Sequence, residues 1–435
     1  MFLTIFKVIN DLINKLQKDM NKLMNFFTSA TEENFNNRSE AGTMQRIASI
    51  DVLRALTMIL MIFVNDQWTL KDIPGWLGHV ERGVDGIGLA DVVFPAFLFI
   101  VGLSLPYAIS NRRKKGDTDW QLVKHVLFRT IALLVMGVFL VNGETYNAEA
   151  TGLPEYIWTP LCCLAFILIW NSYPASSNKY LVIVAKVTAF VMLLILCIIY
   201  RGGKEGNIQH FAPQWWGILG LIGWAYLVSG LITVFARNNF YAIFVGWIFF
   251  CILSMVSKAG LIPHHSIISY IPEAISGGTL TGLTMGGVLT SLIFRYFVNR
   301  RDNKSLTLVL LLFSAFLAGL SVITRPYWGL AKLGATPAWL FLCSAFTILT
   351  FVIIYWIADV MGKSKWFYLI KPAGTATILC YLIPYFAYSI REVLNIHLPE
   401  ALLTGNIGLL KSVLFALLCT LITGLLIRLG IRMKL

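Results

Sequence analysis

Charged residues are scarce in this sequence. Of its 435 residues, 13% are charged and 57% are hydrophobic, whereas a soluble domain carries about 25% charged residues. No polar stretch is long enough to form a separate water-soluble core, because apolar runs recur along the chain. The shortage of charge excludes a string of soluble domains and predicts a protein that resides in a lipid bilayer.

Three further absences narrow the class of protein. The seven cysteines lie inside apolar runs without metal-ligand or redox spacing, which predicts small packing residues. The net charge of +13 lacks a contiguous basic face, since basic residues form short clusters between apolar runs, as at 112–115. Such clusters orient membrane spans, so nucleic-acid binding is disfavoured. No internal repeat is visible, which weakens a transporter interpretation.

Apolar segments that approach the length of a membrane span, about 20 residues, fill most of the chain. The twelve candidates are 47–66, 89–110, 122–142, 155–172, 180–200, 215–236, 240–257, 278–297, 306–324, 338–361, 367–388 and 406–430. The predicted fold class is therefore all-α, a polytopic transmembrane helical bundle of about 12 spans. Lysine and arginine concentrate in alternate loops, and the loop at 143–154 contains none. This bias predicts that both termini are cytoplasmic.

The first 45 residues differ from the rest of the chain. Apolar residues recur there at helical spacing with lysines between them, and a polar linker follows. We expect residues 1–45 to form an amphipathic helix on the membrane surface and its linker, and residues 46–435 to form the transmembrane domain.

Ionisable residues gather at the two ends of the first predicted span. Asp51 and Arg54 are three residues apart near its beginning, where they either neutralise each other or serve a function, and spacing alone favours neither. Asn65 and Asp66 close the opposite end, and His79 is the only histidine in the outer segment that follows. A lone loop histidine is usually solvated, although its ordinary pKa suits general base chemistry.

The second predicted span opens with an acidic residue and a proline. Asp91 stands where a carboxylate caps free backbone amides and meets the positive end of the helix dipole, and capping alone explains its presence. Pro95 is expected in the first helical turn, where proline is tolerated.

At these segments the chain resembles the heparan-α-glucosaminide N-acetyltransferase family, membrane enzymes that move acetyl from cytoplasmic acetyl-CoA to a glucosamine amine. The specific matches are the run RIASIDVLRALTMILMIFVND, the later run GLADVVFPAFLFIVG and the histidine between them. Weaker matches are LFRTIALLVMGVFLVN, GTLTGLTMGGVL and KPAGTATILCYLIPY. The spans at 215–257 resemble an insertion relative to the family core.

The resemblance assigns roles residue by residue. It implies that His79 is the catalytic histidine, Asn65 an active-site asparagine and Asp91 a further polar residue of the catalytic site. It also implies that Asp51, Arg54 and Arg129 are polar positions of the membrane domain. Basic side chains at 54 and 129 suit the phosphates of acetyl-CoA, the expected co-substrate.

The predicted reaction brings together two reactants that cannot cross the bilayer. His79 takes the proton of the attacking amine or carries the acetyl group itself, while Asn65 donates to the oxyanion. No metal is expected, and Lys332 is interpreted as a snorkelling lysine or a contact to an acidic group. Expected partners are an amino sugar or other glycan acceptor, the lipid bilayer and a second copy in a homodimer, with no nucleic acid. The expected location is the bacterial cytoplasmic membrane.

Two alternatives remain open at this point. A multispan transporter or permease for sugars would use His79 and the Asp51–Arg54 pair as coupling groups. An acyltransferase acting on lipid or cell-wall glycan would share the chemistry and differ in its acceptor. A channel that joins an inner basic mouth to His79 would favour a transferase, whereas inverted repeats around a midplane site would favour a transporter.

Overall fold

The computed structural model describes residues 47–204, 206–262 and 271–433, so the interfacial helix predicted over 1–45 lies outside the described residues. The described part of the chain is mainly α-helical, with one two-stranded hairpin of β1 (Arg201–Gly202) and β2 (Gln209–His210). Its long helices are α2 (Ala48–Asp66), α3 (Leu89–Lys114), α4 (Asp119–Glu144), α6 (Glu155–Trp170), α7 (Lys179–Ile199), α8 (Ile218–Ala236), α9 (Phe240–Lys258), α11 (Thr279–Asn299), α12 (Asn303–Trp328), α13 (Pro337–Tyr355), α15 (Thr377–Val393) and α16 (Gly405–Arg428). The short helices are α5 (Ala148–Thr151), α10 (Glu273–Ser276) and α14 (Lys371–Thr375).

Each of the twelve predicted apolar segments overlaps one of these long helices. Ten helices of the described chain are long and apolar enough to cross a membrane, which supports an integral membrane protein. The other two, α6 and α15, have 16 and 17 residues and fall short of that length. The segment predicted at 367–388 is interrupted, because the backbone leaves the helical conformation at Ala376, between α14 and α15. The count of twelve spans and the cytoplasmic termini stay predictions.

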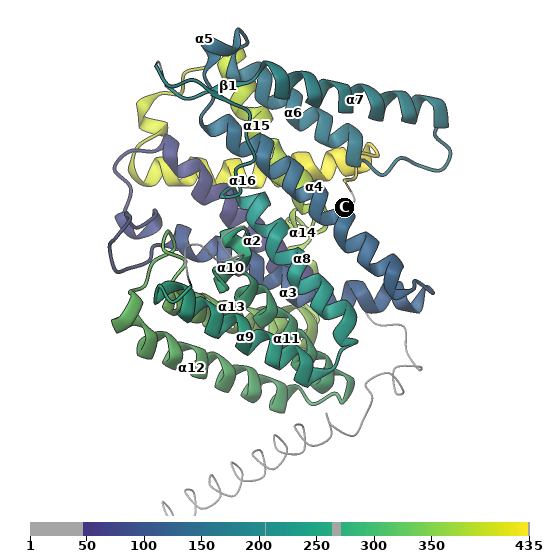
Figure 1. The fold of residues 1–435 in the computed structure, drawn as a ribbon, viewed down its shortest axis with the longest axis vertical. Helices are drawn as coiled ribbons and strands as arrows, with labels where there is room; N and C mark the ends of the chain where they lie inside the picture. The colour runs from purple at the N-terminus through teal and green to yellow at the C-terminus, as the bar shows by residue number, and fades with distance from the viewer. Residues whose placement is uncertain (1–46, 205, 263–270, 434–435) are drawn as a thin grey trace, which may run out of the picture.

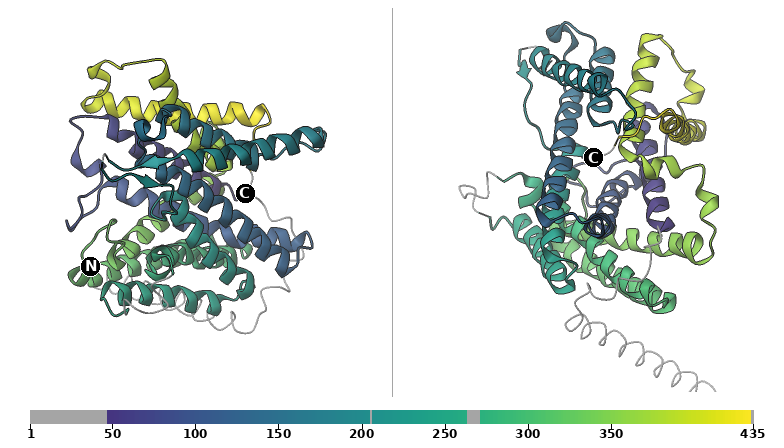
Figure 2. Two further views of the ribbon diagram at one scale, coloured as in Figure 1. Left: turned by 45° about the horizontal axis from the view of Figure 1, so that its top comes forward. Right: turned by 90° about the vertical axis from the view of Figure 1, so that its right-hand side faces the viewer.

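Helices α2 and α3 occupy the middle of the molecule. In every view they lie between α12 and α13 on one side and α16 on the other (Figures 1 and 2). Their neighbours include α11 and α8 against α3, and α13, α14 and α16 against α2. The stretch that carries most of the predicted site residues is therefore enclosed by the rest of the chain.

Close helix packing at the centre depends on glycine. A Cβ added to Gly102 of α3 would lie 1.8 Å from the carbonyl oxygen of Thr284 in α11, and one added to Gly287 would lie 1.9 Å from that of Phe99. Small residues let membrane helices approach to backbone contact, where van der Waals packing holds them. The GTLTGLTMGGVL segment thus forms α11, the most deeply buried of the ten candidate spans.

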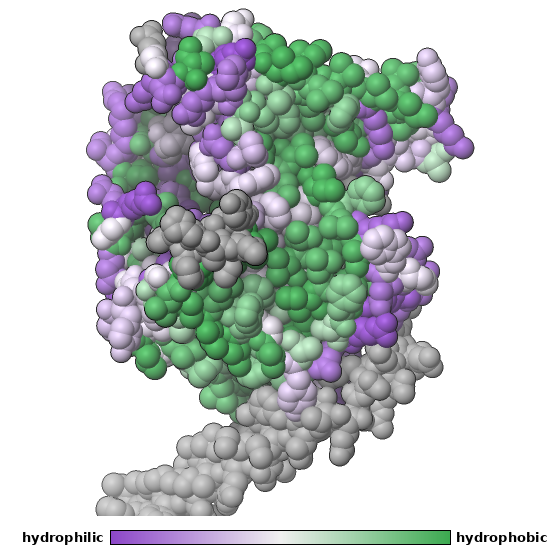
Figure 3. Space-filling model, viewed as in Figure 1, coloured by the Kyte–Doolittle hydropathy of each residue, from purple (hydrophilic) through white to green (hydrophobic). Residues whose placement is uncertain are grey.

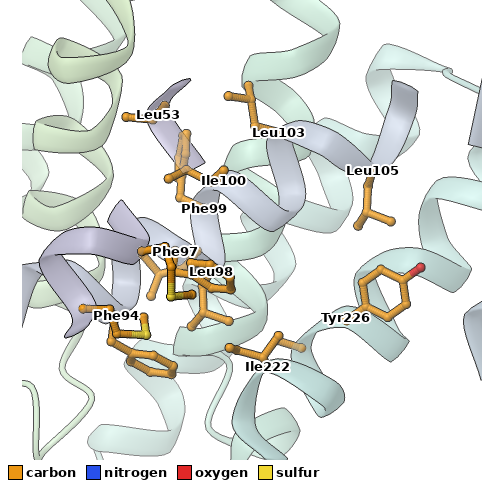
Figure 4. Close-up of a cluster of buried hydrophobic side chains, with 14 of the residues drawn as sticks. Leu53, Phe94, Phe97, Leu98, Phe99, Ile100, Leu103, Leu105, Ile222 and Tyr226 are labelled. Atoms are coloured by element: carbon orange, nitrogen blue, oxygen red, sulfur yellow. The ribbon is translucent and has the colours of Figure 1, made fainter. Parts of the chain in front are cut away.

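The apolar core continues from α3 into α2 and α8. Leu53 of α2 and Ile222 and Tyr226 of α8 lie around side chains of α3 (Figure 4). Phe99 and Leu103 on α3 are fully buried. This packing fixes α3 relative to its neighbours, and so it fixes Asp91 in the first turn of α3.

The surface is apolar across the middle of the face in Figure 3, with hydrophilic margins at its left and right edges. The helices of Figure 1 run mainly between these two margins, α7 and α16 included. This arrangement suits a membrane-spanning protein, because helices satisfy their own backbone hydrogen bonds within the hydrocarbon.

Candidate functional site

The imidazole of His79 is held by the carboxylate of Asp91. The Nδ1 atom of His79 lies 2.7 Å from Oδ1 of Asp91. The other oxygen, Oδ2, accepts hydrogen bonds of 3.0 Å from the backbone amides of Val80 and Gly88. Because an ionised carboxylate only accepts, Nδ1 of His79 donates, and in the neutral imidazole Nε2 then carries the lone pair. Asp91 therefore does more than cap α3: it orients His79 and sets its tautomer.

The position of Pro95 explains how Asp91 is held in turn. The sequence interpretation placed this proline in the first helical turn, which is wrong, because α3 begins at Leu89 and Pro95 lies two turns inside it. A proline there has no N–H for the carbonyl of the residue four positions earlier, which is Asp91. That carbonyl instead accepts a 2.9 Å hydrogen bond from the indole nitrogen of Trp339 in α13.

Lys332 completes the polar contacts of His79. Its Nζ lies 3.3 Å from Nδ1 and 3.5 Å from Nε2 of the histidine. Burial lowers the pKa of the Lys332 ammonium, while the negative charge of Asp91 opposes this shift. The sequence predicts a snorkelling lysine or a contact to an acidic group, and the structure places Lys332 against the candidate catalytic residue.

Asp85 ties the His79 segment to the loop that carries Lys332. Its Oδ1 accepts a 2.7 Å hydrogen bond from the amide of Leu330, and its carboxylate pairs with Nε of Arg325 at 3.0 Å. The amide of Gly86 donates to the carbonyl of Leu330 at 2.9 Å. These contacts hold the segment of Asp85 and the loop of Leu330, about 240 residues apart in the chain, against each other beside His79.

Asn65 and His79 line the same cavity. This His79 cavity has a volume of about 900 Å³ and extends from the end of α2 to the ends of α4, α6 and α15. Asn65 is exposed at its wall, and about half of the His79 side chain is exposed. The structure thus brings His79, Asn65 and Asp91 together, with Asp91 buried behind the histidine.

A second cavity, of about 580 Å³, contains the other predicted residues. This Arg54 cavity is lined by Asp51, Arg54 and Arg129 together with Tyr107. Arg54 contacts Asp51 at 3.3 Å and donates to the carbonyl of Gly374 at 3.1 Å and to the Ser104 hydroxyl. Asp51 therefore partly neutralises Arg54, as its spacing allowed.

Arg129 faces the Arg54 cavity in a different way. Its guanidinium lies 4.7 Å from the ring centre of Tyr226, a cation–π contact. Its buried Nε has no hydrogen-bond partner among the residues that the structure describes. The same is true of the buried hydroxyl of Tyr107. Two residues of one cavity wall thus each carry a buried polar atom without a partner among the described residues.

The two cavities meet at a pair of side chains. Ile218 and Tyr381 line both of them. Helix α2 contributes its first residues to the Arg54 cavity and its last ones to the His79 cavity, and α15 is divided likewise at Tyr381. The two cavities are therefore neighbours along α2 and α15, one with basic side chains and the other with the histidine.

A buried ion pair fixes the wall of the His79 cavity next to Asn65. Asp66 is 2% exposed and accepts from Nζ of Lys411 at 2.7 Å, from Oγ of Ser412 at 2.5 Å and from the hydroxyl of Tyr388 at 2.8 Å. Tyr388 itself lines the cavity. These bonds join the ends of α2, α15 and α16.

Sequence reasoning missed Tyr381, Trp339 and the partners of Asp66. Tyr381 stands inside the KPAGTATILCYLIPY segment that had been matched to the acetyltransferase family, and that match was its available signal. Trp339 and Lys411 lie in later spans with no pattern that separates them from ordinary interfacial residues. The described residues contain no group of three metal-binding side chains.

The arrangement matches an acyl-transfer site in its parts. A histidine oriented by a carboxylate is the ordinary layout of a general base, and an amide side chain in the wall of the same cavity is a candidate oxyanion donor. Basic side chains around the second cavity suit a phosphorylated ligand.

Comparison with known proteins points in the same direction. The chain is 31% identical over 101 residues to heparan-alpha-glucosaminide N-acetyltransferase of Homo sapiens and, to the same extent, to that of Mus musculus. The matched part is 22% of this chain, and the chain spans 14% of the length of these curated relatives. This similarity indicates a distant relationship to a membrane transferase. A family model described as a domain of unknown function, DUF5009, matches residues 46–274, and because this is more than half of the chain, the protein belongs to that family.

Proposed function

We infer that this protein is a membrane acetyltransferase that moves acetyl from cytoplasmic acetyl-CoA to the amine of an extracytoplasmic amino sugar. The observation that carries this proposal is the contact of the two cavities at Ile218 and Tyr381. A donor that enters on one side and an acceptor that enters on the other must meet inside the protein. Neighbouring cavities, one lined by basic side chains and one by a histidine, support this reaction over transport.

The Arg54 cavity is the proposed binding site for acetyl-CoA. Arg54 and Arg129 would hold its phosphates, since guanidinium groups pair well with phosphate oxygens. Nε of Arg129 and the hydroxyl of Tyr107, both without partners among the described residues, fit a polar ligand there. The pantetheine arm would then extend past Tyr381, so that the thioester reaches the His79 cavity.

In the proposed reaction, Nε2 of His79 takes a proton from the acceptor amine. Asp91 keeps Nδ1 protonated through the 2.7 Å contact and stabilises the imidazolium that forms. Asn65 would donate a hydrogen bond to the oxyanion of the tetrahedral intermediate, a contribution of about 10²-fold in rate at comparable sites. Direct attack of the amine is preferred here, because His79 and Asn65 line the cavity that the acceptor would enter.

The proposal is tested by acetyl transfer from labelled acetyl-CoA to glucosamine, using purified full-length protein in detergent. We expect activity in the wild type and a loss of about 10²–10⁴-fold in His79→Ala, the range typical of a general base. His210→Ala is the matched control, because His210 is exposed on β2 and lines neither cavity.

The outcomes separate the reaction from the site. Equal activity in His79→Ala and His210→Ala would keep the enzyme and overturn the assignment of His79. Absence of transfer by the wild type, together with absence of acetyl-CoA binding, would overturn the acetyltransferase proposal.

A further inference from the structure

The walls of the His79 cavity carry more negative than positive charge. Glu144, Glu155 and Glu392 line it at the ends of α4, α6 and α15. Arg391, the arginine of the same lining, pairs with its neighbour Glu392 at 3.3 Å. Glu144 and Glu155 have no ion-pair partner within the described residues. Lys332 lies behind His79 rather than in this lining.

Aromatic side chains share these walls with the carboxylates. Trp68, Tyr156, Tyr385 and Tyr388 line the cavity, and the rings of Trp68 and Tyr388 meet edge to face with centroids 5.8 Å apart. The side chain of Trp68 is 69% exposed. Aromatic faces attract cations and provide flat apolar contact, so carboxylates beside them favour a cationic ligand with an apolar ring face.

An independent observation marks the cavity as a binding site for a polar ligand. Gln67 lines it and is 7% exposed, yet its amide nitrogen has no hydrogen-bond partner among the described residues. The buried hydroxyl of Thr159 in the same lining is also without one. Buried polar groups are normally satisfied, and a hydroxyl-bearing ligand would satisfy these two.

We propose that the His79 cavity selects an acceptor that carries a protonated amine and no anionic group: an unsulfated amino sugar or a short oligomer of such sugars. This inference rests on the proposed function and names its substrate class. Glu144 and Glu155 attract the ammonium group, Trp68 contacts the sugar ring, and Gln67 and Thr159 bind hydroxyls. A sulfate or carboxylate on the acceptor meets like charge and is rejected.

The bound ammonium gives up two protons during transfer. Nε2 of His79 takes the first, which frees the nitrogen lone pair. A bond forms between this nitrogen and the acetyl carbonyl carbon, and the carbon–sulfur bond breaks. The nitrogen's second proton goes to the departing thiolate, which leaves as CoA thiol, and the imidazolium of His79 returns its proton to water.

The test compares two acceptors that bear the same amine, glucosamine and glucosamine 6-sulfate, with purified full-length protein. We expect kcat/KM to favour glucosamine by about tenfold or more, as charge complementarity across a cavity predicts. In the double variant Glu144→Gln/Glu155→Gln, kcat/KM should fall about tenfold for glucosamine and change little for glucosamine 6-sulfate. The preference for glucosamine over the sulfated sugar should therefore become smaller. Glu149→Gln is the matched control, since Glu149 is exposed on α5 and outside the lining.

A second measurement keeps this inference separate from the proposed function. Binding of each sugar is followed by tryptophan fluorescence, which Trp68 in the cavity wall makes sensitive to occupancy. Preferential binding of glucosamine without acetylation would overturn the proposed function and support the acceptor class. Equal use or equal binding of the two sugars, or a double variant that matches Glu149→Gln, would overturn the acceptor class. Acetylation of other amines with no binding of either sugar would overturn it as well.

Discussion

At the scale of single residues, Asp91 combines three tasks through three different atoms. Oδ1 contacts His79, Oδ2 accepts from two backbone amides, and its carbonyl oxygen accepts from Trp339. The last contact exists because Pro95 supplies no N–H to that carbonyl. A helix-breaking residue thus creates the acceptor that anchors the start of α3 to α13.

This relation predicts a coupled effect of two substitutions. Trp339→Phe removes the indole donor and leaves the buried Asp91 carbonyl unsatisfied, which should lower the free energy of unfolding by about 1–3 kcal/mol. In a Pro95→Ala background the new N–H can donate to the Asp91 carbonyl within the helix. Trp339→Phe should therefore lower the free energy of unfolding by less in this background than in the wild type. Thermal unfolding of the four proteins in detergent measures the coupling, and additive effects would contradict the explanation.

At the scale of elements, Asp85 joins the loop after α12 to the segment that carries His79. We expect Asp85→Ala to reduce kcat of acetyl transfer about tenfold, because Lys332 and His79 would lose their mutual placement. Asp85→Asn keeps an oxygen that accepts from the Leu330 amide, so its kcat should fall less than that of Asp85→Ala. Glu81→Ala, in the same segment, is the control, and equal activity of Asp85→Ala and Glu81→Ala would show that the contact is dispensable.

The same carboxylate gives a prediction about pH. The Leu330 amide and then Arg325 hold the pKa of Asp85 below its ordinary value, although burial opposes them. A lowered pKa in the folded state means stabilisation that is present above the unfolded value, about 3.9, and is lost as pH falls through the folded pKa. The contact should therefore persist at every pH above about 4. Amide hydrogen exchange of the loop, followed down the pH scale, measures this; opening of the loop already at pH near 5 would contradict it.

Helix α14 packs against α2 at a glycine. A Cβ on Gly374 would lie 2.3 Å from the carbonyl oxygen of Asp51, and the Gly374 carbonyl accepts from Arg54. Gly374→Ala should cost about 1–3 kcal/mol of stability through overpacking, and it should raise KM for acetyl-CoA. Gly319→Ala on α12, where no atom lies within 4 Å of the added methyl, should be neutral or stabilising. Thermal unfolding and acetyl-transfer kinetics of Gly374→Ala and Gly319→Ala measure these effects. Equal stability and equal KM for acetyl-CoA in the two variants would contradict the prediction.

At the scale of the whole molecule, the two cavities predict that acetyl-CoA and the acceptor enter from opposite sides of the membrane. In proteoliposomes with one orientation, acetyl-CoA on the Arg54 side should acetylate amino sugar supplied on the opposite side. Acetyl-CoA on the His79 side should give no product. Proteoliposomes loaded with labelled acetyl-CoA on one side measure this directly, and equal product from both placements would contradict a two-sided site.

Much of the membrane architecture could be predicted from the sequence, because long apolar runs report burial in lipid directly. His79, Asn65 and Asp91, and separately Arg54 and Arg129, were named from a family resemblance. The structure places His79 and Asn65 in the wall of one cavity with Asp91 behind the histidine, and Arg54 and Arg129 in the wall of the other. Lys332 could not be assigned, since its neighbour His79 is 253 residues away along the chain. Pro95 was misplaced although the predicted span and α3 both begin at residue 89, and its relation to Trp339 is a contact that no local pattern reports. The roles of these residues stay predictions.

The meeting of the cavities at Ile218 and Tyr381 also concerns the membrane itself. If the Arg54 cavity and the His79 cavity open to opposite compartments, the side chains of Ile218 and Tyr381 stand between the water of one and the water of the other. Truncation of Tyr381 would then do more than disturb a reaction: it would open a leak for ions and protons. The energy stored across the bilayer therefore limits how small these two side chains can become.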